Sequence, residues 1–161
     1  MSAKKILTIG EPLLRSISHP VTKFDARLSM ILRDMMQTMY DAQGVGLAAP
    51  QVGLMRRIVV IDVGEGLVEL INPEGIASQG EIAMTEGCLS VPGRRGCVIR
   101  PESVTVRAQD RKGSYFEVEG KGLYARALQH EIDHLDGVLY VDKMSYEVFD
   151  DDEAEQEEAA I

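Results

Sequence analysis

The sequence predicts one domain of the α+β class, with two helices and several antiparallel strands. Apolar residues recur at helical spacing near both ends of the chain, whereas the middle is rich in β-branched residues and punctuated by glycines. The turns between the strand-like runs are short, which favours antiparallel pairing. A length of 161 residues suits a single compact domain, and 45% hydrophobic residues can form its core. The order of helix, strands and helix is typical of an α+β fold.

The first regular element is predicted over residues 25 to 44. Residues 11 to 24 contain two prolines and are expected to run as an irregular, extended segment. Asp25 is a plausible N-cap, and Gly44 lies near the expected end of the helix. Positions at helical spacing would face the core: Leu28, Ile31, Leu32, Met35 and Met39.

Four strands and a second helix are predicted in the rest of the chain. The strands are expected over residues 57 to 63, 67 to 72, 103 to 108 and 114 to 120, and a GEG turn joins the first two. The helix covers residues 122 to 137. Its start lacks a strong capping residue, whereas Gly137 is a credible end.

The negative charge of the chain is concentrated after Lys143. The formal net charge is −9, but eight acidic residues and no basic residue follow Lys143, which leaves 18 acidic and 17 basic residues in the body. The body therefore has no excess charge with which to attract or repel polyanions. We expect residues 1–146 to form a single catalytic domain and residues 147–161 to form an acidic, flexible tail.

The two cysteines and the N-terminus indicate a reducing compartment. Cys88 and Cys97 are the only thiols, and the first residues lack the apolar core of a secretory signal. No apolar run is long enough to span a bilayer. We therefore expect free thiols, a cytoplasmic protein and no membrane partner. Cys97 lies among apolar neighbours and is expected to be buried as a small apolar residue.

The second predicted helix contains the metal-binding pattern HExxH. His130 and His134 lie four residues apart, so both imidazoles can face one ion from the same side of a helix. Glu131 can reach a water bound to that ion and accept its proton. Two imidazoles do not complete the coordination of a metal, so a third ligand is needed.

Three positions in the sequence could supply that third ligand. Tyr140 occupies the place of the third histidine in HExxHxxGxxH, but a phenol is a poor substitute. A glutamate of the acidic tail has suitable spacing but little apolar sequence to position it: Glu153, Glu155, Glu157 or Glu158. Cys88, in the stretch EGCLS, offers a thiolate, which is a strong ligand. The residues alone leave these alternatives open.

Three stretches, taken together, resemble the motifs of peptide deformylases. GVGLAAPQ (44 to 51), EGCLS (86 to 90) and HEIDH (130 to 134) occur in the order found in that family, and the resemblance extends from about residue 10 to residue 143. It implies a hydrolase of protein biosynthesis that removes the N-formyl group from the formylmethionine of new polypeptides and releases formate. With the predicted elements, it implies antiparallel sheets packed around the helix that carries HExxH, and an additional N-terminal helix.

The resemblance assigns the residues of the reaction. Cys88, His130 and His134 would hold the metal, and Glu131 would be the general base and then the general acid as metal-bound water attacks the formyl carbonyl. Gln51 and the backbone N–H of Leu89 would stabilise the oxyanion, as neutral donors can.

The resemblance also assigns residues around the site. It places Glu86 and Arg100 as a pair that supports the cysteine loop, and it implies contacts with the peptide substrate by Val45, Gly46, Gly87, Met84, Arg95 and Leu123. Fe²⁺ is the metal that it favours, and Zn²⁺, Ni²⁺ and Co²⁺ also suit the ligands. A small HExxH metalloprotease with a different third ligand is the alternative function.

The C-terminus departs from the pattern of the best-known bacterial deformylases. These enzymes continue into a basic helix that can contact ribosomal RNA, whereas this chain continues into acidic residues that phosphates repel. We therefore expect only weak contact with the ribosome, no binding to DNA and a monomeric enzyme whose partners are formylmethionyl nascent peptides.

Overall fold

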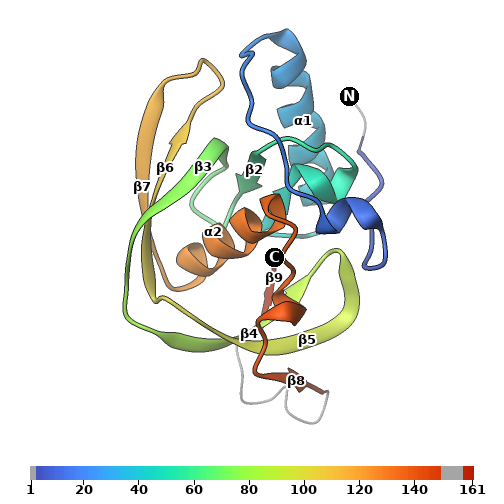
Figure 1. The fold of residues 1–161 in the computed structure, drawn as a ribbon, viewed down its shortest axis with the longest axis vertical. Helices are drawn as coiled ribbons and strands as arrows, with labels where there is room; N and C mark the ends of the chain where they lie inside the picture. The colour runs from blue at the N-terminus through green and yellow to red at the C-terminus, as the bar shows by residue number, and fades with distance from the viewer. Residues whose placement is uncertain (1–2, 150–157) are drawn as a thin grey trace.

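A computed structural model of the chain describes residues 3–149 and 158–161. Helix α1 and the long strands lie around α2, which crosses the middle of the molecule (Figure 1). The elements are η1 (Pro12–Arg15), α1 (Ala26–Asp41), β1 (Gly46–Ala48), η2 (Ala49–Val52), β2 (Ile58–Ile61), β3 (Val68–Gln79), β4 (Ile82–Cys88), β5 (Val91–Arg100), β6 (Ser103–Gln109), β7 (Tyr115–Lys121), α2 (Gly122–Leu135), η3 (Tyr140–Asp142), β8 (Tyr146–Val148) and β9 (Glu158–Ala160).

The strands of the described residues form two sheets. One sheet has the order β1-β2-β3-β6-β7 and the other the order β8-β5-β4-β9. The strand pairs are antiparallel except for β4 and β9, which run parallel. The predicted α+β class with antiparallel sheets around a C-terminal helix is therefore confirmed.

Both helices begin and end close to the predicted positions. Asp25 caps α1, where its side chain accepts a hydrogen bond from the Leu28 backbone N–H. Helix α2 begins at Gly122 without a side-chain cap. Gly137 follows the end of α2 with a φ of +76°, and a β-carbon there would lie 2.6 Å from the backbone of Arg15. Only glycine fits this conformation and this close approach.

The predicted strands are present, but β4 and β5 were not predicted. Neither strand alternates between buried and exposed residues, because each contains a run of consecutive buried residues. Each strand also buries a charged residue, Glu86 on β4 and Arg100 on β5. Strand β3 also extends beyond the predicted residues, from Val68 to Gln79, with a positive φ at Asn72. Cys97 lies on β5 with 5% of its surface exposed, as predicted for a buried free thiol.

The segment predicted as a flexible tail, residues 147–161, contains strand residues at both of its ends. Glu147 and Val148 belong to β8, and Val148 is buried. The strand β9 pairs with β4. Residues 150–157, with six of the eight acidic residues after Lys143, lie outside the described residues. Composition reveals the charge of such a segment but not its backbone pairing.

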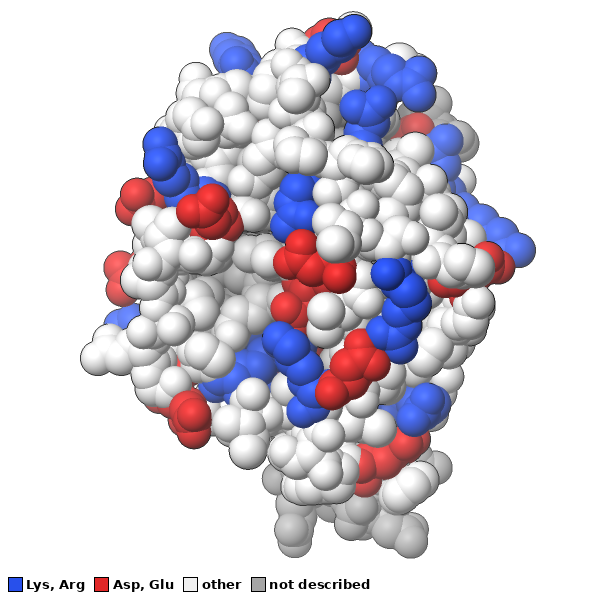
Figure 2. All heavy atoms as spheres, in the orientation of Figure 1, with Lys and Arg blue, Asp and Glu red and all other residues white. Residues whose placement is uncertain are grey.

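The surface of the face shown in Figure 2 has no large region of one charge. Lysine and arginine side chains are interspersed with aspartate and glutamate across it. This distribution agrees with the nearly balanced charge of the chain before Lys143. No helix in the described ranges has the length and the apolarity needed to cross a bilayer.

Candidate metal centre

Three potential metal ligands from two elements meet between the sheets. Cys88 is the last residue of β4, and His130 and His134 face it from α2. Their ligand atoms all lie within 4.8 Å of one another, and Cys88 Sγ is 3.4 Å from His134 Nε2. All three side chains are buried. A sulfur and two imidazole nitrogens at this spacing can coordinate one ion.

Local backbone geometry directs Cys88 toward the helix. The β4–β5 ladder pairs Gly87 with Arg95 but shifts register before Cys88, which pairs with Val91. Such an irregularity bends a strand and redirects a side chain. The two histidines share one face of α2 because they are four residues apart.

Glu86 orients the first histidine. Its Oε1 lies 2.9 Å from His130 Nδ1, and the carboxylate is completely buried. His130 Nε2 has no hydrogen-bond partner among the described residues. A carboxylate on one ring nitrogen fixes the tautomer that leaves the other nitrogen available as a ligand. Burial alone would raise the pKa of Glu86, but hydrogen bonds to His130 and Arg100 outweigh it and hold that pKa well below its usual value.

Two arginines hold Glu86 in its charged state. Arg100 donates from Nε at 2.6 Å and from Nη2 at 3.0 Å, so this pair is bidentate and buried. Arg126 also donates to Glu86, and it donates to the Val98 and Ile82 carbonyl oxygens at 2.9 and 2.8 Å. The predicted pairing of Glu86 and Arg100 is thus present, as the centre of a buried charge cluster.

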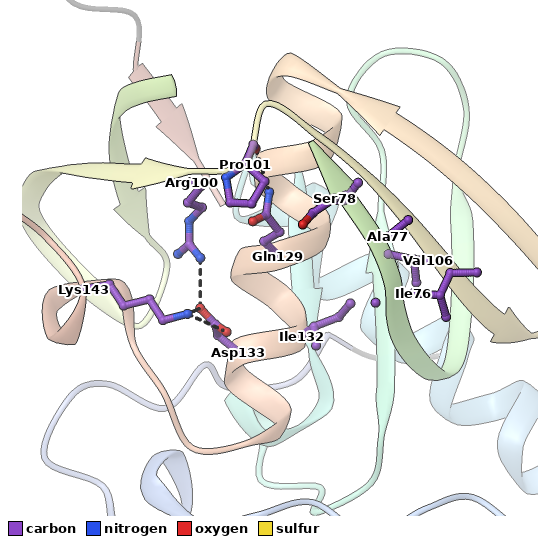
Figure 3. Close-up of a pocket in the computed structure, with 12 residues that line it drawn as sticks. Ile76, Ala77, Ser78, Arg100, Pro101, Val106, Gln129, Ile132, Asp133 and Lys143 are labelled. Atoms are coloured by element: carbon purple, nitrogen blue, oxygen red, sulfur yellow. Dashed lines mark hydrogen bonds and ion pairs between the residues drawn. The ribbon is translucent and has the colours of Figure 1, made fainter. Parts of the chain in front are cut away.

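The charge cluster reaches the surface beside a separate hollow. Asp133 accepts from Arg100 Nη1 at 2.9 Å and forms an ion pair with Lys143 at 3.0 Å (Figure 3). These residues border a cavity of about 420 Å³ that Ile76 and Ile132 also line. The metal ligands are not part of its lining, so the cavity belongs to a different face of α2.

Replacing Arg126 should destabilise the fold. We expect Arg126→Met to lower the free energy of unfolding by about 3–5 kcal/mol, because it removes one partner from a buried charge cluster. Urea denaturation would measure this loss. Arg111→Met is the matched control, since Arg111 forms an exposed pair with Glu69, and exposed pairs contribute at most about 1 kcal/mol. Equal losses in both variants would contradict a structural role for the cluster.

Glu131 lies beside the potential ligands, and its carboxylate is shielded from solvent. It is completely buried, and neither oxygen has a hydrogen-bond partner among the described residues. Burial first, and the charge of Glu86 second, raise the pKa of Glu131 well above its usual value. A β-carbon at Gly46 would lie 2.5 Å from Glu131 Oε2, so only glycine lets β1 pack against this carboxylate. The carboxylate is therefore placed to accept a proton.

Gln51 approaches the ligands from η2. Its Oε1 accepts a hydrogen bond from the Ala48 N–H at 2.9 Å, which leaves Nε2 facing the cysteine. That nitrogen donates to Ser90 Oγ at 3.0 Å and lies 3.8 Å from Cys88 Sγ. Leu89 follows Cys88 directly, in the turn between β4 and β5. The structure thus brings both predicted oxyanion donors to the cysteine loop.

The chemistry of the ligand set fits a divalent metal. Burial first, and the charge of Glu131 second, raise the pKa of the Cys88 thiol, so its thiolate requires a nearby cation. Burial, and then the charge of His130, lower the pKa of His134 well below its usual value, which keeps that imidazole neutral. A neutral imidazole and a cation-stabilised thiolate are the forms that bind metals.

The residues predicted to contact substrate occupy different places around the centre. Val45 and Leu123 pack against one apolar cluster, which includes Ala125 and Leu128 of α2. Met84 is half-buried on β4. Arg95 pairs with Gly87 across the β4–β5 ladder. Its neighbour Arg94 is exposed and forms a bidentate pair with Glu147, so the two arginines have distinct surroundings.

The other candidate third ligands do not join the cluster in the described residues. The Tyr140 ring stacks on His130 with 6.1 Å between ring centroids. Glu158 belongs to β9. Glu153, Glu155 and Glu157 lie outside the described residues. Among the His, Cys, Asp and Glu side chains of the described residues, Cys88 is the third potential ligand that lies with the two imidazoles.

Sequence reasoning missed the supporting residues Arg126, Asp133 and Ser90. Arg126 precedes His130 by four residues, so a signal was available: an arginine on the helix face that carries the ligands. Ser90 and Asp133 offered no comparable signal, because polar residues near a motif are usually exposed.

Comparisons with known proteins agree with this geometry. The model of the family described as polypeptide deformylase matches residues 3–149. The peptide deformylase of Caldicellulosiruptor bescii is 56% identical over 144 residues, which cover 89% of this chain and 87% of that protein. The peptide deformylase of Thermoanaerobacter pseudethanolicus is 53% identical over 156 residues, 97% of this chain and 98% of that one.

Solved structures of the same family have the same fold. The crystal structure of a peptide deformylase from Legionella pneumophila is 50% identical with a TM-score of 0.86, covering 89% of this chain and 86% of that chain. That of peptide deformylase from Thermotoga maritima is 44% identical with a TM-score of 0.87, covering 89% and 98%. The family match, residues 3–149, includes both helices, strands β1 to β8 and the three potential ligands, and this chain belongs to the polypeptide deformylase family.

Proposed function

We propose that this chain hydrolyses the formamide of N-formylmethionyl peptides, with Cys88, His130 and His134 as metal ligands and Glu131 as proton carrier. The observation that supports this proposal most strongly is the meeting of a thiol and two imidazoles beside an unpartnered, buried carboxylate. Members of this family are metal-dependent enzymes that remove the formyl group from new polypeptides. The catalytic domain would comprise residues 1–146.

The residues divide the reaction between them. When bound at this centre, a divalent ion supplies Lewis-acid chemistry that activates water and polarises a carbonyl oxygen. Glu131 accepts a proton from the attacking water, and the oxygen of that water forms the new C–O bond of formate. Glu131 then donates the proton to the amine nitrogen as the C–N bond breaks. The same carboxyl group therefore holds the proton between the two steps.

Two neutral donors stabilise the charge that develops on the formyl oxygen. Gln51 Nε2 is available on the side of Cys88, since Ala48 anchors the amide oxygen. The backbone N–H of Leu89 lies on the residue after the cysteine. Fixed donors aimed at a developing oxyanion need no reorganisation during the reaction.

Replacing the amide of Gln51 should slow the chemical step. We expect Gln51→Glu to reduce kcat by about 10²–10³-fold, because a carboxylate keeps the shape of the side chain but cannot donate to an oxyanion. Steady-state formate release measures the effect. Gln79→Glu is the matched control, since Gln79 is exposed on β3. Equal rates for wild type and Gln51→Glu would exclude Gln51 from the oxyanion site.

The substrate would lie along backbone edges next to the centre. Gly46 leaves room beside Glu131, and Val45 and Leu123 border the apolar cluster that would receive the methionine side chain. Gly87 and Arg95, paired across β4 and β5, would contact the peptide portion. Met84, half-buried on β4, completes the proposed set.

The resident metal is proposed to be Fe²⁺. A site with one thiolate and two imidazoles also suits Zn²⁺, Ni²⁺ and Co²⁺, and affinity alone does not select among them. Purification without oxygen, followed by elemental analysis, would identify the ion. An Fe²⁺ enzyme should lose activity on exposure to air and recover it when the ion is restored.

Formate release from formyl-Met-Ala-Ser tests the proposed function. The chain, reconstituted with each divalent metal, should release formate and Met-Ala-Ser in equal amounts. The alternative, a small metalloprotease, would instead cleave internal bonds of unformylated peptides. Internal cleavage without release of formate by any metal form would replace the proposal with that alternative.

We also propose that the enzyme acts in the cytoplasm, as a monomer, and contacts the ribosome only weakly. The acidic residues after Lys143 support weak contact, because RNA phosphates repel them. Sedimentation with purified ribosomes should leave the chain in the supernatant at physiological salt. Tight binding that is lost on deletion of residues 150–161 would contradict this expectation.

A further inference from the structure

The C-terminal end of the chain forms an extra strand beside the metal centre. In β9, residues 158, 159 and 160 pair in parallel with Thr85, Glu86 and Gly87 of β4. The Ile161 backbone N–H donates to the Gly87 carbonyl oxygen at 3.2 Å. Figure 1 shows β9 alongside β4, with the C-terminus near the middle of the picture. The strand continues past Gly87 to Cys88, so the register places the terminal residue next to the ligand loop.

The last side chain is an apolar anchor. The Ile161 side chain is completely buried. It belongs to the apolar cluster against which Val45 and Leu123 pack. Burial within this cluster removes the apolar surface of Ile161 from water and anchors the end of β9.

The C-terminal segment and a peptide substrate need the same surfaces. On one side β4 is hydrogen-bonded to β5, and β9 covers its other edge. Under the proposed function, an extended substrate adds to a strand edge near Cys88 and places its methionine in the pocket of Val45 and Leu123. β9 occupies this edge of β4, and Ile161 occupies a place in the apolar cluster against which Val45 and Leu123 pack.

We propose that residues 158–161 act as an intramolecular inhibitor that competes with the formylated peptide. This inference rests on the proposed function. The segment binds through a strand edge and one apolar anchor, as a peptide would. The segment carries no N-formyl group and therefore blocks the site without being consumed. Substrate binds only to the fraction of molecules in which β9 has left β4.

Substitution of Ile161 tests the competition directly. Ile161→Asp should release the anchor, because a carboxylate is costly to bury in an apolar cluster. KM for formyl-Met-Ala-Ser should fall while kcat stays constant. The factor by which KM falls equals the reciprocal of the fraction of wild-type molecules in which β9 has left β4. This factor is about tenfold if the segment is bound in nine of ten molecules. Ile161→Leu is the matched control, since it keeps an apolar anchor and should retain the wild-type KM.

Hydrogen exchange separates this proposal from the proposed function. In the intact chain, the amides of Thr85 to Gly87 should exchange faster in Ile161→Asp than in the wild type. In Ile161→Leu they should exchange at the wild-type rate. This result requires no turnover, so it holds even if the chain were not a deformylase. Unchanged exchange in Ile161→Asp would show that the segment does not dock. Faster exchange with an unchanged KM would show docking without competition, and either outcome overturns the proposal.

Discussion

Changing Glu131 to glutamine is expected to reduce kcat for formate release by about 10²–10⁴-fold, the usual contribution of a general acid–base group. The amide has the shape of the carboxylate but cannot accept the proton from water or return it to the amine. The metal should remain bound, because Glu131 is not among the three ligands that meet at the centre. We therefore expect this variant to lose formate release but to keep its metal.

The matched control for Glu131→Gln is Glu119→Gln, the same substitution at an exposed residue of β7. Formate release and metal per chain should be measured on both proteins after identical purification. The control should keep the wild-type rate. Full activity in Glu131→Gln would exclude the proposed proton transfer, whereas loss of metal in that variant would show that Glu131 supports the ligands instead.

Changing Cys88 to serine is expected to remove both the metal and the activity. A hydroxyl does not ionise at neutral pH and is a far weaker ligand than a thiolate, so two imidazoles would remain to hold the ion. Elemental analysis should find about one ion per chain in the wild type and little in the variant.

Cys97→Ser is the matched control, because Cys97 is also a buried free thiol but lies on β5 and does not belong to the ligand cluster. It should keep the ion and the rate of formate release. If Cys88→Ser retained metal and turnover as well as Cys97→Ser does, the third ligand would have to come from elsewhere, and the metalloprotease alternative would gain support.

Local signals in the sequence were sufficient for the helices and for four of the strands. Asp25 caps α1 as predicted, because capping depends on neighbouring residues alone. The alternating pattern of β6 is likewise visible without knowledge of the fold, with Val104, Val106 and Ala108 buried. The three side chains that meet at the candidate metal centre could be named from the sequence, because two of them share a helix face and the third lies in a recognisable motif.

The parts that could not be predicted depend on contacts distant in sequence. Glu86 and Arg126 are 40 residues apart, and each looks like a surface residue until both are buried together. The burial pattern of β4 likewise does not alternate, because its buried residues, Glu86 among them, are consecutive. The strand β9 depends on an open edge of β4 that only the assembled sheet provides.

The ligand set of the bound metal is the most direct test of this account. X-ray absorption on the anaerobically purified protein should detect one sulfur and two nitrogen neighbours, with a zinc–sulfur distance of about 2.3 Å in the Zn²⁺ form. The sulfur signal should persist in Cys97→Ser, and any ion that remains in Cys88→Ser should have no sulfur neighbour. A spectrum with only nitrogen and oxygen neighbours in the wild-type protein would contradict the proposal that Cys88, His130 and His134 hold the metal.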